Sequence, residues 1–278
     1  MKISSFGVTL FTVRNDLLNH YESTLEKLSD MGFRYVEQLN LAPILKRDPL
    51  FGRDIRTVAK LFERYCLQPT SISLFDNAPL DIQLEYASIL GVKQVALGRA
   101  KVFVDFSRSR NPFKLPSSQE LIQYTEDLKY LSDVISNKGF EFLYHTHDLD
   151  LLRIDGLGEN TIEYFSRIFD KTQINFQFDL AWLSIAGCDP VSMLYKYRDR
   201  VSSIHLKNYY KPLDNEAIQF SAPHEGFMDY ASIIPHVIRM IPEQRIFVEI
   251  DNSKSPIEEL KGFINWSKHL HLLSKHKS

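Results

Sequence analysis

The sequence predicts an α/β protein with the architecture of a single (β/α)8 barrel, or TIM barrel, and two observations lead to this fold class. Short apolar segments alternate with segments of helical periodicity along the whole chain, as in a parallel sheet buried on both faces. The length of 278 residues is also close to the roughly 250 that such a barrel typically needs. We therefore interpret residues 1–278 as one domain.

Eight strand–helix units can be assigned in order along the chain. Gly32 and Gly91 mark two of the helix ends, because glycine readily adopts the conformation that terminates a helix. The expected strands are 3–11, 35–39, 70–75, 94–98, 142–147, 174–179, 203–207 and 246–251. The expected helices are one ending at residue 31, then 54–65, 80–90, 118–136, 160–169, 190–197, 230–240 and 256–269.

Two connections, 99–117 and 208–229, are longer than the usual two to six residues or so of βα loops. Both follow a strand, so both are expected over the end of the barrel where active sites lie. Each is a candidate lid, and the alternative for each is a surface insertion.

The composition excludes several functional classes. The net charge of -2 gives no electrostatic reason to expect nucleic acid or an anionic membrane as a partner. The two cysteines, Cys66 and Cys188, exclude a disulfide framework and favour a reducing compartment. No segment approaches the roughly 18 apolar residues of a membrane span, and the first residues lack the apolar run of a signal peptide. We therefore expect a cytoplasmic protein.

The last four strands each end in an acid or a histidine. These residues are His145 with His147, then Asp179, His205 and Glu249. In a TIM barrel the C-terminal ends of the strands converge on one face, so these side chains are expected around one point. Two imidazoles and two carboxylates predict a divalent-metal site. The alternative for Asp179 and Glu249 is that each caps the helix that follows.

Six segments resemble motifs of the sugar phosphate isomerase/epimerase group of xylose isomerase-like TIM barrels. For example, Tyr144–Asp148 resembles Tyr-His-Asn-His-Asp, and Val248–Asp251 resembles Val-Glu-x-Asp. The other four are the opening strand at 7–14, the Leu-Asp-x-x-Trp stretch at 178–190, the Arg-x-x-x-x-His-x-Lys-Asp stretch at 200–208 and the Gly-Glu-Gly-x-x-Asp-Trp turn at 224–230. The chain departs from these motifs at Thr146, Asn208 and His224, and its third strand lacks the histidine that many relatives carry.

The resemblance implies one divalent metal (Mn, Co, Zn or Mg) held by four strand-end residues. Asp179, His205 and Glu249 match three of these ligands directly. His145 is favoured as the fourth, with His147 nearer the substrate, although the two roles could be exchanged. In such a site the metal polarises a carbonyl and an adjacent hydroxyl, and a base removes the proton alpha to the carbonyl to give an enediolate.

The same resemblance assigns roles to further residues. Glu249 is the first choice of base and His147 the second, while Lys207 would stabilise the developing oxyanion or pair with Asp251 or Glu37. The expected substrate contacts are Glu37, Trp182, Arg14 and Glu225. Glu37 could instead be a polar residue of the barrel interior, and Trp182 a core residue. Arg108 and Arg110 could meet a phosphate, or could simply be solvated.

These observations predict a metal-dependent isomerase or epimerase acting on a sugar or keto-polyol. A first alternative is a lyase or dehydratase acting on inosose or 3-keto-glycosides, because the same enediolate can collapse by β-elimination. A second is a barrel that binds sugar without catalysis. The net charge and the small ligand set disfavour a DNA-repair enzyme of the endonuclease IV type. Homo-oligomers are common in this group, so a homo-oligomer is possible.

Overall fold

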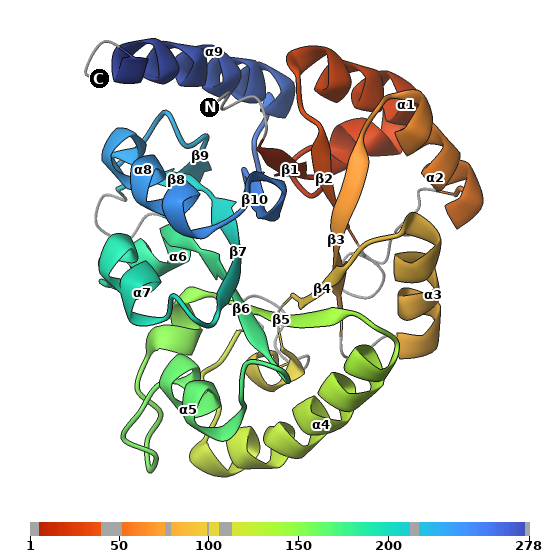
Figure 1. Ribbon diagram of the computed structural model, residues 1–278. Coiled ribbons are helices and arrows are strands. Elements are labelled where there is room, and N and C mark those ends of the chain that lie inside the picture. Colours follow the sequence, from red (N-terminus) through yellow and green to blue (C-terminus); the bar gives the residue numbers. More distant parts are fainter. Residues whose placement is uncertain are drawn as a thin grey trace.

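The prediction of a TIM barrel is confirmed by the computed structural model, which describes residues 6–39, 52–75, 79–98, 100–105, 113–211 and 217–275. Eight parallel strands close into a barrel in the order β1-β10-β7-β6-β5-β4-β3-β2, and the helices surround it (Figure 1). The strands are β1 (Gly7–Thr9), β2 (Tyr35–Gln38), β3 (Gln68–Leu74), β4 (Gln94–Leu97), β5 (Glu141–His145), β6 (Asn175–Asp179), β7 (Val201–Leu206) and β10 (Ile246–Val248).

The helices agree closely with the expected segments. They are α1 (Arg14–Met31), α2 (Ile55–Arg64), α3 (Leu80–Leu90), α4 (Ser118–Asn137), α5 (Thr161–Ile168), α6 (Leu180–Ile185), α7 (Pro190–Lys196), α8 (Tyr230–Met240) and α9 (Pro256–Lys275). The described residues also form the short 3-10 helices η2 (Lys101–Phe103), η3 (Asp148–Leu151) and η4 (Glu243–Arg245). Gly32 and Gly91 end α1 and α3 in the left-handed conformation, as predicted. Within the described ranges, no helix combines the length and apolarity that crossing a bilayer requires.

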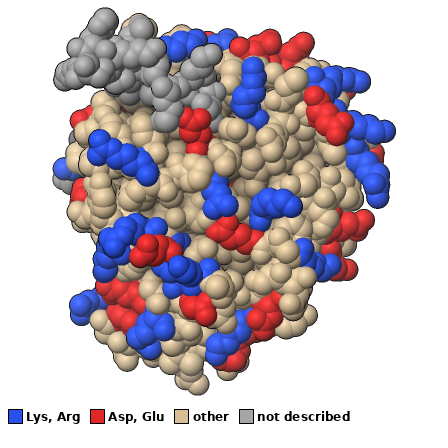
Figure 2. All heavy atoms as spheres, viewed as in Figure 1, with Lys and Arg blue, Asp and Glu red and all other residues tan. Residues whose placement is uncertain are grey.

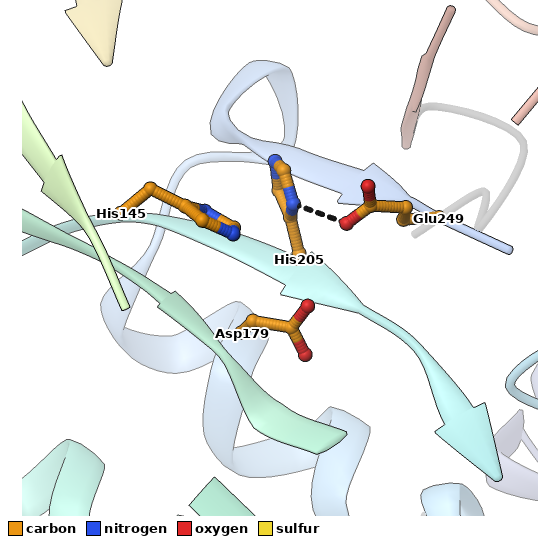
Figure 3. A group of neighbouring side chains, drawn as sticks. All are labelled: His145, Asp179, His205 and Glu249. Carbon is orange, nitrogen blue, oxygen red and sulfur yellow. Dashed lines mark hydrogen bonds and ion pairs between the residues drawn. The ribbon is translucent and has the colours of Figure 1, made fainter. Parts of the chain in front are cut away.

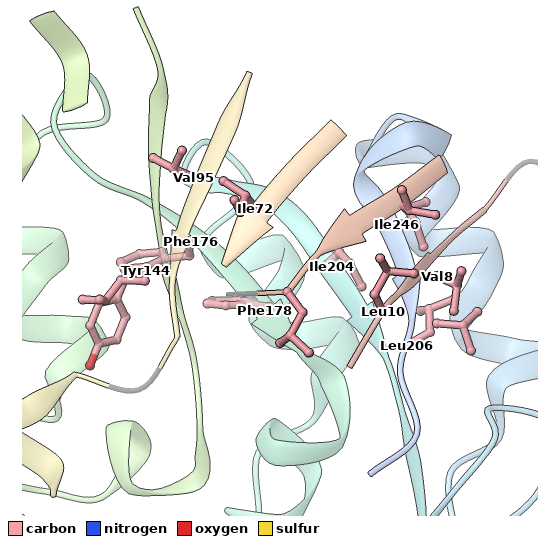
Figure 4. Packing of buried hydrophobic residues seen from close by; sticks show 14 of the residues in the cluster. Val8, Leu10, Ile72, Val95, Tyr144, Phe176, Phe178, Ile204, Leu206 and Ile246 are labelled. Carbon is pink, nitrogen blue, oxygen red and sulfur yellow. The ribbon is translucent and has the colours of Figure 1, made fainter. Parts of the chain in front are cut away.

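Alternate strand residues point toward the helices and form the apolar core between the two layers (Figure 4). Tyr144 meets Phe165 of α5 edge to face, with ring centroids 5.0 Å apart. Phe176 and Phe178 both pack against Tyr197, which follows α7. The intervening residues of each strand therefore face the barrel interior.

The N-terminal end of the barrel is closed by a polar network around Glu141 of β5. This carboxylate accepts hydrogen bonds from Gln94 (2.9 Å), Asn175 (2.9 Å) and Ser202, and it pairs with Arg245 at 3.2 Å. Burial tends to raise the pKa of Glu141, but the hydrogen bonds from Ser202 and Gln94 outweigh that effect, so its pKa lies below its ordinary value. The network ties together strands β4 to β7 and the entry to β10, at the end away from the predicted site.

Strands β5 and β10 end at His145 and Val248 rather than at 147 and 251, and the structure departs from the expected elements in three further places. The first strand is Gly7–Thr9, shorter than the expected 3–11, of which 3–5 lie outside the described residues. The connection 208–229 contains an antiparallel hairpin of β8 (Asn208–Tyr210) and β9 (Gln219–Ser221), with Tyr209 paired to Phe220. An additional helix, α6, begins directly after β6, because the Asp179 carboxylate caps its first turn.

Candidate functional site

Four side chains from four strand ends converge at the C-terminal end of the barrel (Figure 3). His145 ends β5, Asp179 ends β6, His205 lies near the end of β7, and Glu249 directly follows β10. Each offers one ligand atom, all of these atoms lie within 4.8 Å of one another, and all four residues are buried. Ligands of a tetrahedral metal bound at about 2.0–2.3 Å lie roughly 3.3–3.8 Å apart, so these side chains would move closer together on binding a metal.

His205 lies between two carboxylates. Its Nδ1 is 2.7 Å from Glu249 Oε2, and its Nε2 is 2.9 Å from Glu37 Oε1. Burial alone would lower the pKa of His205, but the charges of Glu37 and Glu249 outweigh it and raise the pKa to about 10. The imidazole is therefore protonated in this structure, and a bound metal would displace one of its two protons, as metal binding to histidine generally does.

His145 is neutral, unlike His205. The side chain of Gln177, which points from β6 into the same barrel interior, fixes which ring nitrogen of His145 carries the proton. The Gln177 amide nitrogen donates to Glu37 (2.7 Å) and to Ser203 (3.1 Å), so its oxygen faces His145 Nδ1 at 2.9 Å. His145 Nδ1 must therefore carry the proton, because an amide oxygen only accepts hydrogen bonds. Burial and the nearby charge of His205 lower the pKa of His145 well below its ordinary value, so Nε2 carries a lone pair suited to a metal.

Asp179 performs two tasks with its two oxygens. Its Oδ1 accepts hydrogen bonds from the backbone amides of Ala181 (3.0 Å) and Trp182 (3.3 Å) and so caps α6. Its Oδ2 is completely buried and accepts no well-directed hydrogen bond, although Lys207 Nζ lies 2.8 Å away. The capping interpretation and the ligand interpretation of Asp179 are thus compatible, because each uses a different oxygen.

Lys207 is buried among three carboxylates. Its Nζ lies 2.8 Å from Asp179, 3.1 Å from Glu249 and 3.0 Å from Asp251, with 2% of the side chain exposed. Burial opposes the charged form, but these carboxylates outweigh it and hold the pKa of Lys207 well above its usual value. The expected ion pair with Asp251 is present, whereas no ion pair with Glu37 is seen among the described contacts of Lys207.

The donor set fits a divalent cation. Four carboxyl groups (those of Glu37, Asp179, Glu249 and Asp251) surround two cationic groups (those of His205 and Lys207), so the ionised cluster carries an excess of two negative charges. Asp179 Oδ2 accepts no well-directed hydrogen bond, and His145 Nε2 carries a lone pair because Nδ1 is bonded to Gln177. Both are the kinds of ligand atom that a buried metal site provides.

A cavity of about 400 Å³ opens above this cluster. Of the residues predicted from sequence, His147, Glu37, Trp182 and Lys207 line it together with three members of the cluster, His145, His205 and Glu249. The His147 ring lies 4.8 Å from the His145 ring and 5.8 Å from the Trp182 ring, between centroids. Sequence reasoning missed Gln177 and Phe220 as lining residues. Gln177 lies two residues before Asp179 and therefore on the same side of its strand, a signal that was present in the sequence.

Two predicted substrate contacts lie elsewhere. The Arg14 guanidinium donates to the Phe11 backbone oxygen (2.7 Å) and to the Asn252 side chain (2.8 Å), so it supports the wall of the cavity from behind. Glu225 accepts a hydrogen bond from the Tyr210 hydroxyl at 3.0 Å on the exposed side of the β8–β9 hairpin. Neither residue lines the cavity. Arg108 and Arg110 lie outside the described residues.

Comparison with known proteins identifies the family of this barrel. The family model described as xylose isomerase-like TIM barrel matches residues 25–270. An inosose dehydratase from Clostridium botulinum is 26% identical over 155 residues, which is 49% of this chain and 50% of that protein. An inosose dehydratase from Geobacillus kaustophilus is 20% identical over 266 residues, 84% of this chain and 81% of that protein. The matched part thus ranges from half to four-fifths of these two relatives.

Solved structures share the fold. A sugar phosphate isomerase/epimerase from Parabacteroides distasonis superimposes with a TM-score of 0.72 at 15% identity, over 94% of this chain and 92% of that one. The IolI protein, solved with a bound zinc atom, superimposes with a TM-score of 0.66 at 12% identity, over 96% of both chains. At these identities the likeness concerns the fold alone.

Proposed function

This chain belongs to the xylose isomerase-like TIM barrel family, and from that premise we propose that it is a divalent-metal-dependent isomerase or epimerase of a sugar or keto-polyol. The observation that carries the proposal is the buried cluster of His145, Asp179, His205 and Glu249 at the floor of a cavity. Manganese, cobalt, zinc and magnesium are all compatible with mixed oxygen and nitrogen ligands.

The four cluster residues would hold the metal. When bound, a divalent metal supplies Lewis acidity, which acidifies the C–H bond alpha to a carbonyl. Glu249 suits the ligand role better than the role of base. Burial tends to raise its pKa, but Lys207 and His205 outweigh it and leave the pKa of Glu249 well below its ordinary value, so this carboxylate is ionised and weakly basic.

His147 is therefore our proposed proton carrier. Its ring lines the cavity beside His145 and Trp182, and an imidazole can both accept and return a proton near neutral pH. Return of the proton by His147 to the neighbouring carbon would isomerise the substrate, whereas epimerisation would require a second acid to deliver a proton to the opposite face of the same carbon.

Lys207 acts in this proposal on the carboxylates rather than on the substrate. An ammonium group has three N–H donors, and three carboxylates already lie within 3.1 Å of Lys207 Nζ. Direct stabilisation of an oxyanion would require one of these contacts to be exchanged. We therefore assign Lys207 the task of holding Asp179 and Glu249 in place.

A dehydratase is the second candidate function. Its first step is the same proton removal, followed by loss of a β-hydroxyl as water. The similarity to two proteins named inosose dehydratase favours this candidate.

The proposal is tested by the metal content of untagged protein, measured by inductively coupled plasma mass spectrometry. We expect about one divalent metal per chain in the wild type and its loss in Glu249→Gln and Asp179→Asn. Asp189→Asn is the matched control, because Asp189 caps α7 through Ser192 (2.7 Å) but lies outside the cluster. No metal in the wild type, even after addition of each of the four ions, would refute the proposal.

The two candidate reactions are then separated by incubating the metal-loaded protein with keto-sugars and inosose in deuterium oxide. Deuterium incorporation without loss of mass as water indicates an isomerase or epimerase, and loss of water indicates a dehydratase. Neither reaction with a metal-loaded protein would favour the non-catalytic binding barrel.

A further inference from the structure

The cavity has two chemically different halves. Strands β5, β6, β7 and β10 supply the polar half, with His145, Gln177, His205 and Glu249 and with His147, Lys207 and Asp251. Strands β1 to β4 supply a half whose upper residues are Phe11, Leu39, Phe75 and Gly98, and Phe113 stands at its rim. Each of these four positions follows the end of its strand, two residues beyond an interior residue (Thr9, Glu37, Ser73 and Ala96), and all eight residues line the cavity. The division is thus a property of successive strands and not of one loop.

The apolar half is held in a fixed shape. The Gln83 side chain accepts a hydrogen bond from the Phe75 backbone amide (2.9 Å) and donates one to the Phe75 backbone oxygen (3.0 Å), so the residue that carries this ring is clamped. A Cβ added at Gly98 would lie 3.6 Å from the Phe75 ring, in ordinary contact. The missing side chain at Gly98 therefore leaves space directly beside an aromatic ring.

This surface is not explained by catalysis at the floor or by packing. The aromatic rings of the polar half already face a cation, since Lys207 Nζ lies 5.6 Å from the Trp182 ring centroid and 5.1 Å from that of Phe220. In the apolar half the Arg14 guanidinium lies 3.9 Å from the Phe11 ring centroid, yet Phe11 and Phe75 line the cavity together with Phe113, which is 42% exposed at the rim. A bare polyol would leave this wall without an apolar partner, whereas ligand pockets typically bury apolar ligand surface against such walls.

The polar half also limits which chemical groups of a ligand can lie at the floor of the cavity. Lys207 is the only Lys or Arg among the described residues that line the cavity, and it is already engaged by three carboxylates. A divalent metal would balance the excess of two negative charges, so the metal-loaded floor would offer no excess positive charge to a phosphate and would favour a neutral carbonyl or hydroxyl group.

We propose that the substrate is an amphipathic carbohydrate: a neutral, oxygen-rich ring that meets the cluster, carrying an aryl or alkyl substituent that lies against Phe11, Leu39, Phe75 and Phe113. This inference rests on the proposed function for the orientation of the oxygen-rich ring. It narrows the substrate class from sugars in general to sugars with an apolar group attached.

The test is a comparison of two ligands by isothermal titration calorimetry on metal-loaded protein. Methyl β-D-glucopyranoside and phenyl β-D-glucopyranoside share the sugar ring and differ in the apolar substituent. We expect the phenyl glycoside to bind the wild type at least about tenfold more tightly, because only its substituent is large enough to cover the apolar wall. Equal affinities would overturn the inference.

Two variants locate the preference. Phe75→Asn removes the ring, and Gly98→Val fills the space beside it, so either change should reduce the phenyl-to-methyl ratio to about threefold or less. Tyr130→Asn is the matched control, since Tyr130 is 66% exposed on α4 and lies outside the cavity. A phenyl preference that survives both cavity variants would overturn the assignment.

Binding of neither glycoside would also overturn the inference, but it would not affect the proposed function. That function is judged by metal content and by turnover of unsubstituted keto-sugars, neither of which requires the apolar wall. Conversely, the protein could prefer the phenyl glycoside and yet bind no metal. That result would support the amphipathic ligand and refute the proposed metal-dependent function.

Discussion

Replacement of Lys207 by methionine should destabilise the metal-free protein strongly. The change keeps an unbranched apolar chain of similar length but removes the ammonium group that contacts Asp179, Glu249 and Asp251 within 3.1 Å. All three carboxylates would then be left in a site where at most 14% of any of their side chains is exposed. Three carboxylates gathered in a buried site without the ammonium group between them are costly.

The expected magnitude follows from this geometry. Removal of one partner of a buried ion pair costs about 3–5 kcal/mol, which for a protein of this size corresponds to a fall in Tm of about 6–20 °C. Burial raises the pKa values of Asp179 and Asp251 above their ordinary values even beside Lys207, and loss of that ammonium group would raise them further, so the deficit is present above about pH 4 and grows as the pH rises. We therefore expect a smaller loss at pH 5 than at pH 8.

The assay is thermal unfolding followed by circular dichroism, in EDTA and then with added divalent metal. A metal that replaces the missing positive charge should recover much of the Tm of Lys207→Met, and it should raise the wild-type Tm less. Lys261→Met is the control, because Lys261 pairs only with exposed Glu258 at 2.7 Å and such a pair contributes about 0–1 kcal/mol. A Tm of Lys207→Met in EDTA that matches that of Lys261→Met would refute the reasoning.

Three further predictions concern other parts of the molecule. Gln177→Leu should weaken metal affinity about 10- to 100-fold without unfolding the protein, because His145 loses the partner that fixes its tautomer; unchanged affinity in a competition titration would contradict this. Glu225→Gln should leave kcat and KM within about twofold of the wild type, because its carboxylate contacts Tyr210 outside the cavity; a large rise in KM would restore its predicted substrate role. Glu141→Gln should cost about 1–3 kcal/mol in urea unfolding at pH 7. The folded-state pKa of Glu141 is lowered, so its contribution is present above the unfolded pKa of about 4.3 and is lost as the pH falls through the lower folded value. The difference between variant and wild type should therefore vanish in acid, and a difference that persists at pH 2 would show that another interaction is responsible.

The prediction of the fold from sequence succeeded because its signals are local. Apolar strand segments, helix-stopping glycines such as Gly32, and helix caps such as Ser117 act over a few residues, and each is visible in the sequence. The position of the site was equally accessible. Once the barrel is recognised, strand ends converge by topology, and the cluster of His145, Asp179, His205 and Glu249 is the one expected. The β8–β9 hairpin escaped prediction because its strands have three residues each, too few for a clear periodicity.

The sequence was enough to predict the barrel, the order of its strand–helix units and the residues that meet at its C-terminal end. The protonation and hydrogen bonding of these residues became visible only in the folded protein. His205 bonds to Glu249, 44 residues away, and to Glu37, 168 residues away, and Gln177 bonds to Glu37, 140 residues away. The partners of a buried charge depend on which side chains share the low-dielectric interior, because closure of the barrel brings distant strands face to face there and excludes the water that would otherwise screen them.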